Sequence, residues 1–454
     1  MWSYIDKTDV ESFINEYPQL AEGFAEISLY ETEDRIFVPR LFYLNFPKYI
    51  KVFKGKDEPI FNPTYFKFTG KLRDGQVESV NTILDIYYKQ KSVNGIAKCP
   101  PGFGKTVIST FIASKIGLKT CIVIDVENLL NQWIESFMTF TDLKAEDIGL
   151  IKGKHFIIDR PVVIASVQTL LSKVRTDMHK HFQLFDEAKF GLVFFDEVHN
   201  TSSASKYSKA SLMFRTKNII GLSATPFQNG TAEILMRNTV GPNIYETKQY
   251  DSKPIYILNY YDSGLTSKYA YVIGRMSDYI KRKAFYNSII IKSPAYLNII
   301  LNLVKKRLAE ERVVLILVFT KAQVKLISDG LTNENIEHRR FYGDEKDAID
   351  KVNTKVLIGT YAFIGKGFDF ALLSSLILGT NLAGKKSLIQ VIGRILRSSD
   401  NKLQPIVDDL IDTRFPSLFL PDIKAKKSIV TAEFNCEIRD VRDEQIIETG
   451  NEII

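Results

Sequence analysis

The segment CPPGFGKT, at residues 99–106, constrains this chain more than any other stretch of its sequence. It follows the short apolar segment 95–97 and opens a run with helical patterning at residues 107–113. This is the succession of strand, loop and helix that a phosphate-binding loop requires, because such a loop presents its backbone N–H groups at the N-terminus of a helix. The segment therefore predicts a site that cradles the phosphates of a nucleotide.

The residue types in the loop suit this chemistry. Gly102 and Gly104 allow the backbone to turn its N–H groups inward. Lys105 can reach the β- and γ-phosphates, and the hydroxyl of Thr106 can bind a magnesium ion. The consensus begins with glycine where this chain has Cys99, so a chance Gly-x-Gly-Lys-Thr in a surface turn is the alternative for this segment taken alone. The predicted nucleotide-binding residues of the loop are Pro101, Gly102, Phe103, Gly104, Lys105 and Thr106.

Downstream of the loop, apolar strand patterns alternate with helical patterns. Strands are expected at residues 120–124, 161–166, 191–195 and 219–222, and a helix at residues 129–140. Strands that are apolar throughout and separated by helices indicate a parallel sheet with both faces covered. The predicted fold class is therefore α/β, and its chemistry is expected where the strands end at their carboxyl termini.

The strongest polar motif after a strand is Asp196-Glu197-Val198-His199. Asp196 can hold magnesium together with Thr106, and Glu197 can polarise the water that attacks the γ-phosphorus. An acidic turn after a strand is the alternative. The position of the acidic pair, downstream of a phosphate loop in the same alternating pattern, favours the magnesium site.

Two further polar features are ambiguous by themselves. Gln76 stands at the start of a predicted helix, and its amide could pair with two edge atoms of adenine or could simply be a polar residue at a helix start. The segment SATP at residues 223–226 follows a predicted strand. Its hydroxyl groups could relay movement from the magnesium site, or the segment could only form a turn.

From residue 313 onward a second alternation of strands and helices begins, without a second phosphate loop. A second parallel sheet is expected, with polar residues after the strand at 356–358. Gln390, Arg394 and Arg397 follow at helical spacings of four and three, so they share one helical face. Two arginines on such a face can stabilise charge on a transferring phosphoryl group, while a surface salt-bridge patch is the alternative.

In their order and spacing, these blocks resemble the motifs of superfamily 2 helicases over about residues 69–420. The resemblance implies two tandem RecA-like domains with a small N-terminal accessory module, ATP and Mg²⁺ as cofactors, and Arg397 as arginine finger with Arg394 as its companion. It also implies that the adenine is read by Gln76, and that nucleotide and strand are sensed together near Gly367 and Asp369. The predicted catalytic residues are Lys105, Glu197, Gln390, Arg394 and Arg397, and the predicted nucleic-acid contacts are Gln168, Thr169, Phe319, Thr320 and Thr360.

Within this superfamily, the Asp-Glu-Val-His block looks most like phage-encoded recombination helicases of the UvsW type, which act on branched DNA. This resemblance implies an ATP-dependent DNA helicase or translocase that unwinds or branch-migrates forks and four-way junctions. An RNA helicase, a nucleotide-gated DNA clamp and a motor subunit without strand separation are the alternatives.

Changes in composition and the positions of turn-forming residues divide the chain into five expected parts. Residues 1–68 form an accessory module, either a DNA-gripping module or a packing cap on the next domain, and residues 69–250 form the ATP-binding domain. Residues 251–290 are a basic linker, residues 291–420 the second RecA-like domain, and residues 421–454 a C-terminal tail.

The overall composition excludes several classes of protein. The apolar fraction of 45% and charged fraction of 25% are those of a globular protein, and a net charge of +7 permits a polyanionic partner without requiring one. Three widely spaced cysteines favour a reducing compartment and argue against a zinc site. Neither a secretory signal nor a run of about 20 apolar residues is evident. We therefore expect a cytoplasmic monomer that does not bind a membrane.

Overall fold

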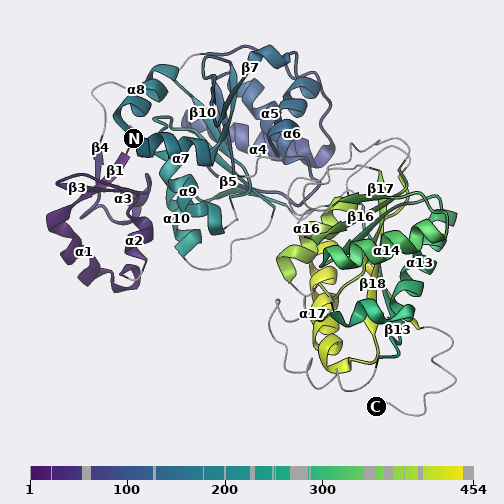
Figure 1. Cartoon of the computed structure of the whole chain (residues 1–454). Coiled ribbons are helices and arrows are strands. Elements are labelled where there is room, and N and C mark those ends of the chain that lie inside the picture. Colours follow the sequence, from purple (N-terminus) through teal and green to yellow (C-terminus); the bar gives the residue numbers. More distant parts are fainter. Residues whose placement is uncertain are drawn as a thin grey trace. The chain divides into compact units, whose positions relative to one another are not determined.

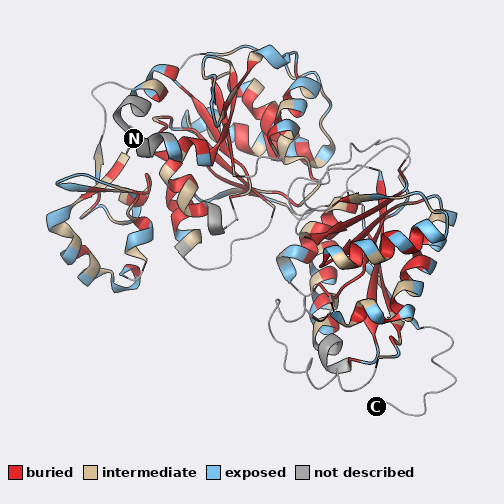
Figure 2. Cartoon of the chain, in the orientation of Figure 1, coloured by how far each residue is buried: buried red, intermediate tan, exposed pale blue. Residues whose placement is uncertain are grey.

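The computed structural model describes residues 2–21, 23–53, 63–125, 129–176, 178–198, 201–224, 231–247, 250, 252–265, 285, 288–341, 354–361, 372–382, 384–396 and 402–442. The chain folds into two compact units. Unit 1 comprises Met1–Pro100 and Gly104–Gln249, and unit 2 comprises Pro101–Phe103 and Tyr250–Ile454. Each unit contains one large sheet between helices, and its buried residues concentrate on the strands (Figures 1 and 2).

The large sheet of unit 1 is almost entirely parallel. Its strand order is β12-β5-β11-β10-β6-β9-β7-β8, and among these described strands only the β7–β8 pair is antiparallel. Strands β6, β9, β10 and β11 are buried along their whole length, as their apolar sequences predict. The strands are β5 (Asn94–Lys98), β6 (Thr120–Ile124), β7 (Ile148–Lys152), β8 (His155–Phe156), β9 (Val162–Ser166), β10 (Leu192–Phe195), β11 (Ile219–Ser223) and β12 (Asn243–Glu246).

Two groups of helices cover this sheet. One group packs in the series α4-α5-α6, and the other packs through α7, α8, α9 and α10 (Figure 1). Right-handed crossovers between parallel strands place these groups on opposite faces, because the chain moves across the sheet in opposite directions in the two halves. The helices are α4 (Asp74–Gln90), α5 (Lys105–Ile116), α6 (Leu129–Phe140), α7 (Val167–Thr176), α8 (Met178–Ala188), α9 (Thr201–Ser211) and α10 (Thr231–Thr239).

The N-terminal module is a small antiparallel sheet of order β2-β3-β1-β4 with three short α-helices among its described residues. Its apolar core is continuous with that of unit 1. Trp2 Nε1 donates to the carbonyl of Leu212 at 2.9 Å, and the Leu41 N–H donates to the carbonyl of Asn238 at 2.8 Å. The module thus packs beside α9 and α10, as a packing cap would, while a role in gripping DNA stays a prediction. Its elements are β1 (Trp2–Asp6), α1 (Val10–Glu16), α2 (Phe24–Ile27), β2 (Tyr30–Glu31), β3 (Arg35–Val38), α3 (Phe42–Asn45) and β4 (Lys51–Phe53).

Unit 2 contains a fully parallel sheet of order β15-β16-β14-β17-β18-β13-β19. Helices α13 and α14 pack together, as do α16 and α17, and the two pairs cover opposite faces (Figure 1). The two large sheets confirm the predicted α/β class with tandem RecA-like domains. The elements are β13 (Ile255–Tyr261), α13 (Pro294–Ala309), β14 (Val313–Val318), α14 (Lys321–Asn333), β15 (Arg339–Phe341), β16 (Val356–Thr360), β17 (Leu373–Leu378), α16 (Lys385–Ile395), β18 (Ile406–Asp412), α17 (Pro416–Phe434) and β19 (Glu437–Arg442).

Two predicted boundaries require correction. The expected linker 251–290 contains β13, which pairs with both β18 and β19 and is therefore an interior strand of the second sheet. The expected tail 421–454 contains the end of α17 and β19, which forms an edge of the same sheet. An edge strand tolerates charged side chains on both faces, which is why the polar sequence of β19 did not indicate a strand. Residues 266–284, where most of the basic linker was expected, lie outside the described residues.

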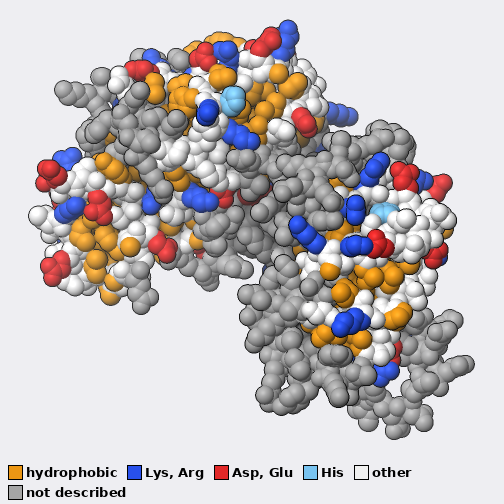
Figure 3. Space-filling model, viewed as in Figure 1, with side chains coloured by type: hydrophobic (Ala, Val, Ile, Leu, Met, Phe, Trp, Pro, Cys, Tyr) orange, Lys and Arg blue, Asp and Glu red, His pale blue; other side chains and the backbone are white. Residues whose placement is uncertain are grey.

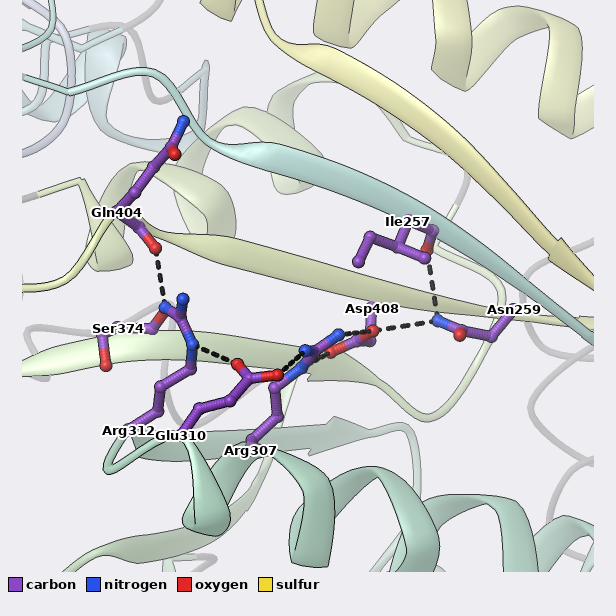
Figure 4. A network of polar contacts seen from close by, with 8 residues as sticks. All are labelled: Ile257, Asn259, Arg307, Glu310, Arg312, Ser374, Gln404 and Asp408. Carbon is purple, nitrogen blue, oxygen red and sulfur yellow. Dashed lines mark hydrogen bonds and ion pairs between the residues drawn. The ribbon is translucent and has the colours of Figure 1, made fainter.

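The interior of unit 2 holds a connected network of charged side chains (Figure 4). Arg307 on α13 donates through Nε and Nη2 to Asp408 on β18, at 2.8 and 2.7 Å. Glu310 accepts from Arg307 Nη1 at 2.8 Å and from Arg312 Nε at 2.6 Å, and Arg312 Nη1 donates to the carbonyl of Gln404 at 2.6 Å. Asp408 is fully buried and Arg307 is 2% exposed, so this network fixes the position of α13 on the sheet.

The described surface carries side chains of both charges. On the face shown in Figure 3, acidic and basic side chains are interspersed over the described parts of both units. Charge alone therefore does not mark a nucleic-acid interface on that face. Among the helices of the described residues, none combines the length and the apolar character needed to cross a bilayer.

Candidate functional site

The phosphate loop joins the end of β5 to the start of α5. Gly102 and Gly104 have φ angles of 84° and 92°, in the left-handed region that favours glycine. Gly104 is the residue before α5, so the helix begins at Lys105 with its N–H groups directed toward the loop. A Cβ atom on Gly104 would lie 2.3 Å from Nε2 of Gln76. Glycine is required here both by the backbone and by this neighbouring amide.

Gln76 lies beside the loop, as expected for a residue that reads the base of a bound nucleotide. It is 3% exposed, and its Oε1 accepts a hydrogen bond from the Arg73 N–H at 3.0 Å at the start of α4. Nη2 of Arg73 would lie 3.1 Å from the same Cβ position on Gly104. The sequence did not single out Arg73, although its place just before a helix that leads to the phosphate loop could have suggested it.

Asp196 follows β10 and is 7% exposed. Its Oδ2 accepts a hydrogen bond from Trp133 Nε1 at 2.9 Å. Burial, followed by the negative charge of Glu197, raises the pKa of Asp196 to about 6, while the charge of Lys105 opposes this rise. A cation would therefore stabilise the ionised carboxylate.

The donor set fits magnesium. Asp196 offers a carboxylate and Thr106 a hydroxyl, and Mg²⁺ prefers oxygen ligands and often takes only one or two carboxylates together with substrate phosphates. In the part of the chain that the structure describes, no cluster of three or more His, Cys, Asp and Glu forms an all-protein metal cage. The two residues fit an ion that binds together with a nucleotide.

Lys105 and Glu197 form an ion pair at this site. Lys105 Nζ lies 3.7 Å from Glu197 Oε1, and the lysine side chain is 12% exposed. Glu197 has a φ of 54°, which is uncommon for a residue other than glycine. A strained backbone of this kind is often found at functional sites, and here it directs the carboxylate that follows the buried strand.

Neighbouring strands hold these groups at one edge of the sheet. The Asp196 N–H donates to the carbonyl of Val123 at 3.0 Å, and the Cys99 N–H donates to the carbonyl of Ser223 at 2.9 Å. Because the strands are parallel, their carboxyl ends meet at the same edge. Burial raises the pKa of the Cys99 thiol to about 12, so this unusual loop residue is an unreactive packing residue. His199, Thr225 and Pro226 lie outside the described residues.

The residues predicted to contact nucleic acid in unit 1 differ in their exposure. Gln168 is exposed, and its Nε2 donates to the main-chain oxygen and to Oδ1 of Asp125, at 2.7 and 2.6 Å. Lys206 Nζ also donates to Asp125 Oδ1, at 2.9 Å. Thr169 is 8% exposed, and its hydroxyl accepts from the Gly153 N–H, so it supports the fold. The sequence did not single out Asp125, although it directly follows the predicted strand at 120–124.

In unit 2, the expected contact residues Phe319 and Thr320 are buried. The Phe319 ring packs against Tyr361 with centroids 5.3 Å apart, and the Thr320 hydroxyl caps α14 by accepting from the Gln323 N–H. Thr360 ends β16 and is 9% exposed. Phe319 and Thr320 thus stabilise the fold of unit 2, and contacts from all three residues to nucleic acid stay predictions.

Gln390 and Arg394 lie one turn apart on α16, and both are partly exposed. This is the shared helical face that their spacing predicts. Gly367, Asp369 and Arg397 lie outside the described residues, so their assigned roles stay predictions.

Comparison with known proteins gives this site a family context. Residues 69–228 match the family described as "Type III restriction enzyme, res subunit", or ResIII. The matched segment contains the phosphate loop and the acidic pair, and it ends just beyond β11.

Several known proteins are similar to this chain in sequence. "Putative helicase 161L" of Invertebrate iridescent virus 6 is 29% identical over 375 residues, 76% of this chain and 78% of the viral protein. "Putative ATP-dependent RNA helicase L396" of Acanthamoeba polyphaga mimivirus is 26% identical, over 82% of this chain and 71% of that protein. "Putative DNA 3'-5' helicase Rad25" of Haloarcula marismortui is 36% identical over 151 residues, 33% of this chain and 23% of that protein.

A solved structure shares the fold of the chain. The structure of S. cerevisiae Dbp5 bound to RNA and ADP BeF3 aligns with a TM-score of 0.56 at 16% identity, over 84% of this chain and 92% of that one. The likeness supports a fold with two RecA-like domains.

Proposed function

We propose that this chain is an ATP-driven helicase or translocase that acts on DNA, with forks and four-way junctions as its preferred substrates. The observation that carries this proposal is the meeting of Lys105, Asp196 and Glu197 at the carboxyl edge of the unit 1 sheet. A phosphate-binding lysine, a metal carboxylate and a second carboxylate beside them are the groups that ATP hydrolysis requires. The ResIII match over the same residues supports this interpretation.

The residues of the site have different roles in ATP hydrolysis. The loop N–H groups and Lys105 bind the phosphates, and phosphate oxygens compete with Glu197 for the lysine ammonium 3.7 Å away. Once released from Lys105, the Glu197 carboxylate orients the attacking water and accepts its proton. A magnesium ion held by Asp196 and Thr106 would neutralise charge on the phosphates when bound.

Substitution of two lysines on the same β5–α5 segment tests the nucleotide site. Lys105→Ala should abolish binding of ATP, since it removes the phosphate contact. Lys98→Ala is a matched control, because Lys98 is also 12% exposed and pairs with Glu246 at 3.6 Å, but stands before the loop. Equal loss of nucleotide binding in both variants would contradict the assignment of Lys105.

Glu197→Gln separates binding from hydrolysis. The amide keeps the size of the side chain but cannot accept the proton of water, so nucleotide binding should persist while turnover falls by about 100-fold or more. Turnover near that of the wild type would remove Glu197 from the mechanism.

The choice of nucleic acid is tested by stimulation of turnover. DNA is favoured by the resemblance of the Asp-Glu-Val-His block to branched-DNA helicases and by the relative named as a DNA helicase. An RNA helicase is the second candidate, because another relative carries that name. Side-by-side ATPase and strand-displacement assays with forked DNA and structured RNA distinguish the two. ATP hydrolysis on forked DNA without displacement of a labelled strand would instead indicate a clamp or a translocating motor.

Three residues of the predicted family motif complete the proposal. By their resemblance to the family motif, Gln390, Arg394 and Arg397 stabilise charge on the transferring phosphoryl group. Arg397→Ala should remove turnover and spare ATP binding. Retained turnover in this variant would refute the arginine-finger assignment.

A further inference from the structure

Two buried aromatic side chains bind Asp196 through polar atoms. Trp133 on α6 is 1% exposed, and its Nε1 donates to Asp196 Oδ2 at 2.9 Å. Tyr207 on α9 is fully buried, and its hydroxyl donates to the main-chain oxygen of Asp196 at 2.6 Å. The side chain and the backbone of Asp196 are thus each held by a separate helix.

The bond from Trp133 selects one oxygen of the carboxylate. An indole N–H can only donate, so Oδ2 must be the acceptor. With Oδ2 held in place, rotation of the carboxylate about its Cβ–Cγ bond is restricted, and Oδ1 is the oxygen that Trp133 does not contact. Because Trp133 is packed in the core of unit 1, the indole itself has little freedom to move.

The bond from Tyr207 acts on the backbone instead. It fixes the peptide unit that joins Asp196 to Glu197, next to the strained φ of 54° at Glu197. A main-chain oxygen can only accept, so the Tyr207 hydroxyl is the donor in this bond. The Tyr207 ring packs against Phe195, the last residue of β10, with centroids 5.1 Å apart.

We propose that Trp133 and Tyr207 are positioning residues for the divalent cation that binds with the nucleotide: Trp133 orients the Asp196 carboxylate, and Tyr207 fixes the backbone that carries Asp196 and Glu197. This proposal rests on the nucleotide site described under "Proposed function". An apolar helical pattern ordinarily indicates only that an aromatic residue packs in the core. The proposal gives each of these two aromatic residues a further role.

The two residues predict different kinetic effects. Partners that orient metal ligands typically contribute about 10- to 100-fold in metal affinity. Trp133→Phe should therefore raise the Mg²⁺ concentration for half-maximal ATPase activity at least about tenfold, with kcat restored at saturating Mg²⁺. Tyr207→Phe should lower kcat as well, because it frees the backbone on which Glu197 depends.

A matched control separates these effects from the loss of a buried tyrosine hydroxyl in general. Tyr256 in unit 2 is also fully buried, and its hydroxyl donates to Asp409 Oδ2 at 2.6 Å. Tyr256→Phe should leave the Mg²⁺ dependence unchanged. Far-UV circular dichroism and thermal unfolding of each variant show whether it is folded at the assay temperature.

Fluorescence provides a test that does not depend on turnover. Trp2 and Trp133 are the only tryptophans of the sequence, so Trp2→Phe leaves Trp133 as the single emitter. Mn²⁺ is a paramagnetic probe that quenches emission at short range. Addition of Mn²⁺ with ADP should give a saturable quench of Trp133, which Asp196→Ala should abolish. The Trp133→Phe variant, in which Trp2 emits alone, should show no such quench.

The possible outcomes are distinguishable. If a fluorescent ADP analogue does not bind the wild-type chain, the nucleotide site fails and this inference fails with it. If the analogue binds but Trp133→Phe and Tyr207→Phe both keep the wild-type Mg²⁺ dependence, only the positioning role is overturned. Equal quenching of Trp2 and Trp133 by Mn²⁺ would also overturn it.

Discussion

Removal of one partner from the buried Arg307–Asp408 pair should destabilise unit 2 strongly. Asp408→Ala deletes the carboxylate that accepts from Arg307 at 2.7 and 2.8 Å and from Asn259 at 3.0 Å (Figure 4). The guanidinium stays buried, and within the described part of unit 2 only Glu310 remains as its acidic partner. The loss of one member of a buried pair costs about 3–5 kcal/mol of unfolding free energy, because the remaining charge is not compensated.

The double variant Arg307→Met, Asp408→Leu is the informative control. It removes both charges and fills their space with apolar atoms, and Glu310 keeps Arg312 as partner at 2.6 Å. Replacement of a whole buried pair is often neutral or stabilising, so the double variant should lie within about 1 kcal/mol of the wild type or above it. If both variants are equally unstable, the uncompensated charge is not the cause.

The two units offer separate signals for this experiment. Both tryptophans of the sequence, Trp2 and Trp133, lie in unit 1, whereas far-UV circular dichroism reports on both units. In urea, Asp408→Ala should shift the dichroism transition of unit 2 to lower concentration and leave the tryptophan transition in place. A decrease of less than about 1 kcal/mol in the unfolding free energy of unit 2 would refute the argument that an uncompensated buried charge is costly.

Three further substitutions follow from single observations. Gly104→Ala should weaken ADP binding at least about tenfold in a fluorescence titration, because its φ of 92° is strained for alanine and its Cβ would meet Gln76. Arg40→Met should raise the unfolding free energy by about 1 kcal/mol or more in urea, since Arg40 is 4% exposed and its Nε and Nη1 have no hydrogen-bond partner among the described residues. Burial raises the pKa of the Asp412 carboxyl to about 6, so the folded state binds the proton of this carboxyl more tightly than the unfolded state does. The stability of the wild type therefore falls as the pH rises from about 4 to about 6. Asp412→Asn keeps the acceptor oxygen but does not titrate. Its unfolding free energy, measured in urea at several pH values, should exceed that of the wild type by an amount that grows across this window to about 3 kcal/mol above pH 6.

The central strands and the phosphate loop were predictable because their signals are local. The strand expected at residues 120–124 and the helix expected at 129–140 coincide with β6 and α6. An apolar run bounded by polar residues leaves little choice in a sheet that is covered on both faces. Asp196 and Glu197 directly follow another apolar run of this kind, so the preceding strand defines their position at the edge of the sheet.

The second sheet was less predictable because it buries charge. Strand β18 contains Asp408, Asp409 and Asp412, all fully buried, and such a sequence does not indicate an interior strand. Asp408 and Asp409 are compensated by Arg307 and Lys426, which come from helices α13 and α17. A pattern of hydrophobicity contains no information on which cation of another element will neutralise a buried carboxylate.

Motif matches locate residues but do not determine their exposure. Phe319 and Thr320 occupy positions that the family resemblance assigns to nucleic acid, yet one fills the core and the other caps a helix. Conversely, Trp133 belongs to an apolar helical pattern, and this pattern did not indicate the hydrogen bond from Trp133 to Asp196. The direction of a single N–H bond depends on tertiary packing, so only the structure distinguishes a core indole from one that orients a carboxylate.

Helix α9 connects the proposed nucleotide site with a residue that is expected to contact nucleic acid. Its consecutive residues Lys206 and Tyr207 donate to Asp125 and Asp196, which follow the neighbouring strands β6 and β10. Asp125 is also held by Gln168, the exposed residue expected to meet nucleic acid. A helix is stiff over the span of two adjacent residues, so a shift of the Asp196 backbone that moves Tyr207 must also change the bond from Lys206 to Asp125. The groups proposed to bind the nucleotide and its cation and those expected to contact nucleic acid thus share one supporting helix within a single RecA-like domain.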